Sequence, residues 1–201
     1  MLVPLCLINI SVSFFGRCAV FPLSPFFLRQ KLSALAAYAW HRPRCLFSGH
    51  EPIGPLVVRA ETRHHLPCGL LSAVVQVESD GHAHRISSAG AMGVAQLEPA
   101  TARALGVSDP FDDAEALDGA ARYLHAQLAT FHDTRLAAAA YNAGPGAVVG
   151  HAVPHNGQTE IYVARVMHAL TLERRARCYA PRHSEGLEGR EISGVGGPRR
   201  R

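Results

Sequence analysis

The chain has 201 residues, of which 48% are hydrophobic and 18% are charged. This composition indicates a globular protein with a core of ordinary size and excludes an intrinsically disordered one. The net charge of +4 is uneven, because residues 61–172 carry 6 Arg against 11 Asp and Glu while both flanks are basic. The positive charge therefore lies outside the part predicted to fold, and no nucleic-acid partner is expected.

Residues 1–60 form an apolar and basic segment that is predicted to be a flexible flank. Residues 1–16 are almost wholly apolar but lack the positive charge that begins a secretory signal. A second apolar run, residues 32–40, follows Arg29 and Lys31 and is short for a membrane-spanning helix. We interpret the segment as an export signal, a membrane anchor or translated sequence ahead of a later start, with export favoured.

Residues 61–172 are predicted to form one mainly α-helical domain without convincing strand alternation. Five segments have helical apolar spacing or helix-stop signals at their ends: residues 64–79, 99–105, 114–131, 136–142 and 158–170. Gly106 is expected to end the second of them, and Gly144-Pro145-Gly146 the fourth. Residues 173–201 are rich in Arg, Gly and Glu and are predicted to be a basic, disordered tail.

Cysteine and histidine spacing indicates no metal site. The five cysteines form no CxxC pair, and Cys68, which lies inside the predicted domain, is expected to be a buried thiol. His82 and His84 lie near His64 and His65 but have no second ligand cluster, so they are expected to be solvated loop histidines.

Glu78 is the candidate catalytic group. It follows Leu71, Val74 and Val75 at seven, four and three residues, so its carboxylate continues the apolar stripe of the predicted helix. Partial burial there raises the pKa of a carboxyl group toward that of a usable proton donor. A glutamate near a helix end can equally bend out into solvent, and the helix alone leaves both interpretations open.

Four sequence blocks follow one another in this region. Residues 70–79 contain Leu-Leu and end in Val-Glu-Ser, and residues 86–101 read ISSAGAMGVAQLEPAT. Residues 141–148 read YNAGPGAV, and residues 158–163 read QTEIYV. Together, over about residues 61–170, they resemble the soluble lytic transglycosylase domain of bacterial cell-wall enzymes.

The resemblance implies a lysozyme-like helical fold that cleaves the β-1,4 bond between N-acetylmuramic acid and N-acetylglucosamine and leaves 1,6-anhydromuramoyl ends. Glu78 matches the family's catalytic acid, and no metal or organic cofactor is implied. Five further residues match positions that line the sugar cleft: Ser87, Gln96, Tyr141, Asn142 and Tyr162. Their amides, hydroxyls and aromatic faces suit sugar binding. Structural roles are the alternative. Ser87 would cap a turn, Gln96 would satisfy loop backbone groups, and Tyr141 and Tyr162 would be core aromatics with the hydroxyl at the rim.

The chain departs from the family pattern at Glu98, at Glu115-Ala116 and at Gln158. Glu98 stands where a hydrophobic residue is common and adds a carboxylate near the expected cleft. A second negative charge there is predicted to raise the pKa of Glu78.

Two other functions remain open. A lysozyme-like hydrolase would need a second carboxylate, from Asp80, Glu98 or Asp118, to activate water. A protein that keeps the fold only to bind peptidoglycan or a secretion apparatus would not need Glu78. The resemblance implies peptidoglycan strands as the partner and a periplasmic or cell-envelope location. It leaves open a secretion or conjugation machine as a second partner, and a membrane anchor.

Overall fold

The computed structural model describes residues 25–45 and 51–178, and these residues are mostly helical. Their helices are α2 (Pro25–Cys45), α3 (Ile53–Arg63), α4 (Leu70–Ser79), α5 (Pro99–Ala104), α6 (Asp113–Phe131), α7 (Thr134–Ala143) and α8 (Gln158–Glu173). Two short turns are a 3₁₀ helix, η1 (Pro145–Ala147), and a π-helical turn, η2 (Arg174–Cys178). In the described part of the chain, β pairing is limited to isolated bridges from Met92 to Ile86 and to Leu97. The prediction of a mainly α fold is confirmed.

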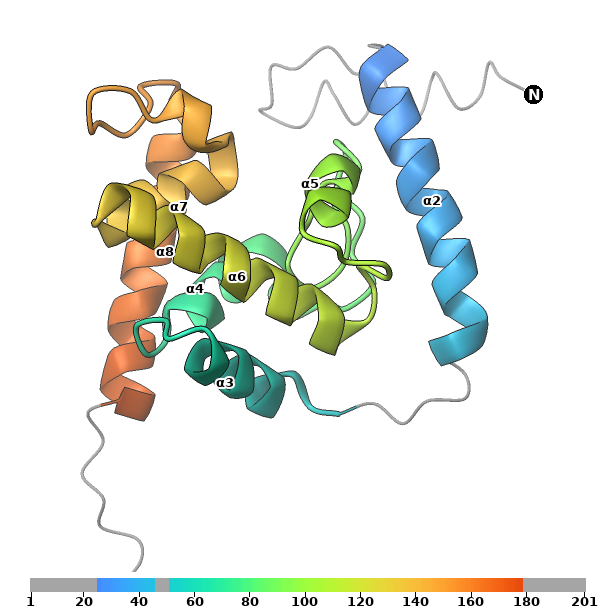
Figure 1. Ribbon diagram of the computed structural model, residues 1–201, viewed down its shortest axis with the longest axis horizontal. Coiled ribbons are helices and arrows are strands. Elements are labelled where there is room, and N and C mark those ends of the chain that lie inside the picture. The colour runs from blue at the N-terminus through green and yellow to red at the C-terminus, as the bar shows by residue number, and fades with distance from the viewer. Residues whose placement is uncertain (1–24, 46–50, 179–201) are drawn as a thin grey trace, which may run out of the picture.

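Helix α4 lies at the centre of the core. Leu70, Leu71 and Val74 are completely buried, because α4 has apolar side chains on most of its circumference. Helix α8 packs along α4, α6 pairs with α7, and α3 packs against α6 (Figure 1). Glu78, near the end of α4, therefore lies on a helix that is packed into the apolar core.

The ends of the later helices follow local capping. The carboxylate of Asp112 accepts a hydrogen bond from the Glu115 N–H at 2.9 Å, and α6 begins at the next residue. Asp133 accepts hydrogen bonds from the Arg135 and Leu136 N–H groups in the first turn of α7. The helices predicted over residues 99–105, 114–131, 136–142 and 158–170 are confirmed to within three residues at each end.

The predicted helix over residues 64–79 is wrong in its first part. The chain leaves α3 at Arg63 and enters α4 only at Leu70. Pro67 interrupts the backbone hydrogen bonding, and Gly69 adopts a left-handed φ of +83°. The buried carboxylate of Glu61 on α3 accepts hydrogen bonds from the N–H groups of Gly69 and Ser72, so it caps α4 from outside that helix.

The packed helices begin before the predicted boundary at residue 61. Leu56, Val57 and Ala60 of α3 are buried in the same core as α4, and Ala34 of α2 is buried with them. The apolar run at residues 32–40 is thus part of α2, and α2 packs against α5. None of the helices in residues 25–45 and 51–178 is long and apolar enough to cross a membrane. The interpretations made for residues 1–24 lie outside the described residues.

Residues 174–178, which the sequence placed in the predicted tail, form an ordered turn. Helix α8 continues into η2, and a disulfide joins Cys178 to Cys68 just before α4. The guanidinium of Arg177 lies 3.4 Å from the Glu61 carboxylate, which adds an ion pair at the same place. The prediction of a buried Cys68 thiol is therefore wrong, because Cys68 forms a disulfide. The sequence contains no signal that pairs two cysteines 110 residues apart. Residues 179–201 lie outside the described part.

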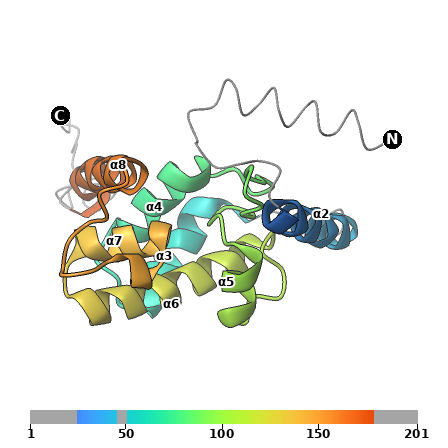
Figure 2. The ribbon, with the colours of Figure 1, turned by 90° about the horizontal axis from the view of Figure 1, so that it is seen from above.

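The loop between α4 and α5 (residues 80–98), together with α5, separates α2 from the packed pair of α4 and α8. Figure 2 shows α2 at one end of the molecule and α8 at the other, as does Figure 1. The loop is packed so tightly that a Cβ added at Gly93, whose φ is +71°, would overlap the Pro110 carbonyl oxygen. Glycine is therefore required at this position in the loop.

Candidate active site

Glu78 is the second-to-last residue of α4, and its neighbour Ser79 fixes the end of that helix. The buried Ser79 hydroxyl donates a hydrogen bond to the Val94 carbonyl at 2.7 Å and accepts one from the Gly81 N–H. Asp80 then ends α4 with a left-handed φ of +55°. The Glu-Ser pair thus joins the helix carrying Glu78 to the loop that forms one wall of the site.

Tyr162 of α8 donates a hydrogen bond from its hydroxyl to Oε1 of Glu78 at 2.8 Å. Tyr162 is only 8% exposed, so the contact is sheltered from water. The two residues are 84 positions apart in the sequence and meet because α8 packs along α4. One carboxylate oxygen of Glu78 is therefore held in a defined position.

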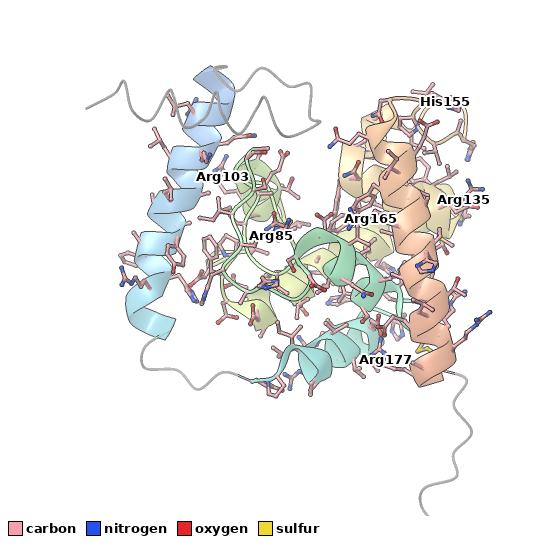
Figure 3. All side chains as sticks on the ribbon, turned by 180° about the vertical axis from the view of Figure 1, so that it is seen from behind. Arg85, Arg103, Arg135, His155, Arg165 and Arg177 are labelled. Atoms are coloured by element: carbon pink, nitrogen blue, oxygen red, sulfur yellow. A yellow bond between two sulfur atoms is a disulfide. The ribbon has the colours of Figure 1, made fainter. Side chains whose placement is uncertain are left out.

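Burial raises the pKa of Glu78 from 4.5 to about 7. The hydrogen bond from Tyr162 and the positive charges of Arg85 and Arg165 lower this pKa but do not offset the loss of solvation. Figure 3 labels both arginines near the end of α4 that carries Glu78, Arg85 on the loop and Arg165 on α8. A carboxyl group with a pKa near neutrality can donate a proton and later accept one, as general acid–base catalysis requires.

A cleft of about 330 Å³ opens beside Glu78. Its walls come from the end of α4, from the loop before α5, and from α5 and α6. The end of α7 with the residues after it and the first residue of α8 complete them. Three of the five predicted sugar-binding residues line it: Gln96, Tyr141 and Asn142. The structure thus brings these three side chains to the same cleft as the candidate acid.

Protein contacts hold each of these three side chains. The Gln96 amide donates to the Gly93 and Arg85 carbonyls at 2.8 and 3.1 Å, and the Tyr141 hydroxyl donates to the Ala95 carbonyl at 2.8 Å. Oδ1 of Asn142 accepts a hydrogen bond from the Thr159 hydroxyl at 3.0 Å. These contacts orient the side chains at the cleft wall.

The other two predicted residues occupy different places. The Ser87 hydroxyl accepts a hydrogen bond from the Ala91 N–H at 2.9 Å, so it caps a turn and is not among the residues that line the cleft. Tyr162 is also absent from the lining and contacts Glu78 instead. The turn-capping alternative for Ser87 therefore describes its observed contact.

Three residues near the candidate acid were missed in the sequence. Tyr123 of α6 lines the cleft, with its ring centroid 5.5 Å from that of Tyr141. Its position beside the apolar stripe of α6 was a weak signal for such a role. Arg85 and Arg165 act on the charge of Glu78, but no spacing in the sequence connects either residue with it.

The predicted effect of Glu98 on the pKa of Glu78 is wrong. Glu98 lines the cleft, but it is exposed, and its charge contributes instead to the raised pKa of Tyr123, for which burial is the larger cause. The charges that act on Glu78 are those of the two arginines. Solvent screening accounts for the weak reach of an exposed carboxylate.

The remaining candidate carboxylates lie elsewhere. Desolvation is the largest single influence on the pKa of Asp118 on α6 and raises it. The contacts with His64 at 2.8 Å and Arg63 at 3.0 Å, with the charge of Arg122, together hold this pKa below its ordinary value. Asp80 is exposed at the end of α4. Neither residue lines the cleft. Among the described residues that do, Glu98 is the second carboxylate beside Glu78.

Comparison with known proteins identifies the family. The model of the transglycosylase SLT domain matches residues 55–161, more than half of the chain, and the chain belongs to this family. It is 34% identical over 113 residues to a transglycosylase of Enterobacteria phage PRD1, a match that covers 56% of this chain and 41% of the phage protein.

Two solved structures are similar in fold. The first is an inactive glutamate-to-glutamine mutant of the lytic transglycosylase Slt from Pseudomonas aeruginosa, with a TM-score of 0.54 and 25% identity. The second is the 70 kDa soluble lytic transglycosylase SLT70 from Escherichia coli, with a TM-score of 0.56 and 22% identity. Each match covers 61% of this chain and 24% of the other. The chain thus spans less than half the length of these three relatives, and the resemblance seen in the sequence is confirmed for family and fold.

Proposed function

We propose that this chain is a peptidoglycan lytic transglycosylase. It would cleave the β-1,4 bond between N-acetylmuramic acid and N-acetylglucosamine and form 1,6-anhydromuramoyl ends. The observation that carries the proposal is a sheltered carboxyl, Glu78, with a pKa of about 7, beside a cleft lined by amide and tyrosine side chains. Membership of the SLT domain family and the transglycosylase names of its relatives support the same reaction.

In the proposed first step, Glu78 donates its proton to the glycosidic oxygen. The bond from that oxygen to C1 of the muramoyl sugar breaks, and the N-acetylglucosamine leaves with a free hydroxyl. The oxygen of the substrate's own 2-acetamido group stabilises the positive charge that develops at C1. The hydrogen bond from Tyr162 keeps the Glu78 carboxylate in place once it is charged.

In the second step, the Glu78 carboxylate accepts the proton of the muramoyl C6 hydroxyl. The hydroxyl oxygen attacks C1 of the same sugar and closes the 1,6-anhydro ring, which restores the protonated acid. Because the attacking group belongs to the substrate, the reaction needs no water and one carboxyl group is sufficient. Holding the hydroxyl close to C1 supplies much of the rate advantage over external water.

We assign sugar binding to the cleft wall. Gln96 and Asn142 present amides suited to hydroxyl and N-acetyl groups, and Tyr123 and Tyr141 present aromatic surface suited to a pyranose ring. On this assignment, peptidoglycan glycan strands are the partner of the cleft and the cell envelope is the place of action.

Hydrolysis is the second candidate, because Glu98 lines the same cleft as Glu78. Two carboxyl groups across a glycosidic bond can act as acid and as base or nucleophile. The products distinguish the reactions, since an anhydro end is lighter than a hydrolysed end by one water. Purified peptidoglycan digested with the full chain and analysed by mass spectrometry should yield anhydro ends. Hydrolysed ends that disappear in Glu98→Gln would instead support the hydrolase.

A further inference from the structure

Helix α2 uses one face to attach to the protein. Gln30, Ala34 and His41 are buried, and Nδ1 of His41 lies 2.9 Å from Oδ2 of Asp109. At Gly90, an added Cβ would lie 2.8 Å from the backbone of Gln30, so the loop and α2 are in close contact. This face is a packed interface, and α2 has a defined orientation on the molecule (Figure 2).

The opposite face of α2 is apolar and exposed. Leu28, Leu32 and Leu35 are 55, 58 and 50% exposed, and their spacing places them on one side of the helix. We define the outer face as these three leucines together with the exposed Ala36 and Ala39, which extend the same stripe. The outer face lies roughly half a turn away from Ala34 and His41. A contiguous apolar stripe of this kind marks an interaction surface.

The charges of α2 have one sign. Its 21 residues include four basic residues, Arg29, Lys31, Arg42 and Arg44, and no acidic residue. Arg29 and Arg42 are exposed on the two borders of the outer face. Two copies meeting through this face would bring basic side chains together, whereas an anionic partner would be attracted. Apolar contact combined with basic borders suits an anionic lipid surface.

We propose that the outer face of α2 docks on the surface of an anionic lipid bilayer. The helix would lie in the plane of the interface, with the three leucines at the acyl boundary and Arg29 and Arg42 among the headgroup phosphates. No residue of α2 lines the cleft beside Glu78. A docked molecule therefore keeps the cleft accessible, and the inference does not depend on the reaction that takes place there.

The single tryptophan of the chain makes the test specific, because Trp40 lies on α2 and is 67% exposed. The full chain is mixed with vesicles of phosphatidylglycerol and, in parallel, with vesicles of phosphatidylcholine. The expected result is co-sedimentation with the anionic vesicles and a shift of Trp40 emission to shorter wavelength. Both signals should weaken as salt is added, because the attraction of Arg29 and Arg42 is electrostatic.

The test variant combines Leu28→Glu and Leu32→Glu on the outer face. The control variant is Val149→Glu, at a residue away from α2 that is 74% exposed. The double variant should bind anionic vesicles at least about tenfold more weakly and keep its cleavage activity in the absence of lipid. Val149→Glu should bind like the wild type.

Three results would overturn the proposal. The first is an absence of binding to anionic vesicles. The second is binding to anionic vesicles that produces no shift of Trp40 emission and is equally strong in the leucine variants. Such a result would assign the lipid contact to another part of the chain. The third is a dimer in size-exclusion chromatography that Leu32→Glu dissociates, which would assign the outer face to a second copy.

Discussion

Two sides of the cleft differ in how they hold their polar side chains: a helical wall, to which α4 contributes Glu78, and a loop wall, which carries Gln96 and Glu98. On the helical wall, Glu78 of α4 is sheltered and receives a hydrogen bond from the buried Tyr162 of α8. On the loop wall, Gln96 is held by hydrogen bonds to backbone carbonyls, and Glu98 is exposed. Both walls carry a carboxyl group. That of Glu78 on the helical wall is sheltered and has a pKa of about 7, whereas that of Glu98 on the loop wall is exposed to solvent. Burial rather than residue type therefore determines which carboxyl can serve as the acid.

The largest expected effect is the loss of activity in Glu78→Gln. The amide keeps the shape of the side chain but cannot donate the proton, and general acid catalysis is typically worth about 10²–10⁴-fold. Cleavage of purified peptidoglycan should fall by at least that factor. Glu98→Gln, the matched change on the loop wall, should retain most of the activity. If Glu78→Gln kept more than about a tenth of the wild-type rate, Glu78 could not be the general acid.

The same substitution should stabilise the protein at high pH. The folded protein holds the Glu78 proton up to a pKa of about 7, whereas the unfolded chain releases it near 4.5. Wild-type stability therefore falls as pH rises from about 4.5 through about 7, because the unfolded state binds fewer protons than the folded state. Glu78→Gln removes this loss, so its advantage should be on the order of 1–3 kcal/mol above pH 7 and should shrink below pH 4.5.

Thermal or denaturant unfolding across this pH range measures that difference. Glu98→Gln is the control, because it removes an exposed carboxyl group from the same cleft. Equal pH dependence in the two variants would mean that burial does not distinguish the two walls.

Tyr162→Phe should have an intermediate effect, seen in the pH profile. The Tyr162 hydroxyl stabilises the charged form of Glu78, so its removal should raise the pKa of Glu78 above about 7. The general acid works in its protonated form, and the alkaline limb of kcat/KM against pH should therefore move to higher pH. Arg165→Gln removes a positive charge and should move the limb in the same direction by a smaller amount. A movement to lower pH in either variant would contradict the assignment of these two groups.

The smallest expected effect is that of Glu98→Gln on the pH profile. Because the exposed Glu98 acts on Tyr123 and not on Glu78, the alkaline limb should remain in place. Any change should appear in KM, since Glu98 lines the cleft where we place the sugars. A clear movement of the limb would show that the loop wall does influence the acid and would reinstate the interaction expected from the sequence.

Local sequence patterns determined much of the fold and the identity of the candidate acid. Apolar periodicity located α6 and α8, glycine and proline signals located the ends of α5 and α7, and short-range caps account for the starts of α6 and α7. The motif order pointed to the SLT domain family, and Glu78 followed from its place on an apolar stripe. All of these signals act within one helix or turn, so a linear pattern can carry them.

Only the tertiary structure decided which distant residues meet. The hydrogen bond from Tyr162 to Glu78 spans 84 positions, the Cys68–Cys178 disulfide spans 110, and α2 attaches through residues outside the predicted domain. The predicted influence of Glu98 failed for the same reason, because a charge acts through distance and solvent exposure, and sequence spacing specifies neither for a loop side chain. The pKa that makes Glu78 a usable acid depends on the packing of α8 against α4, which exists only in the folded chain.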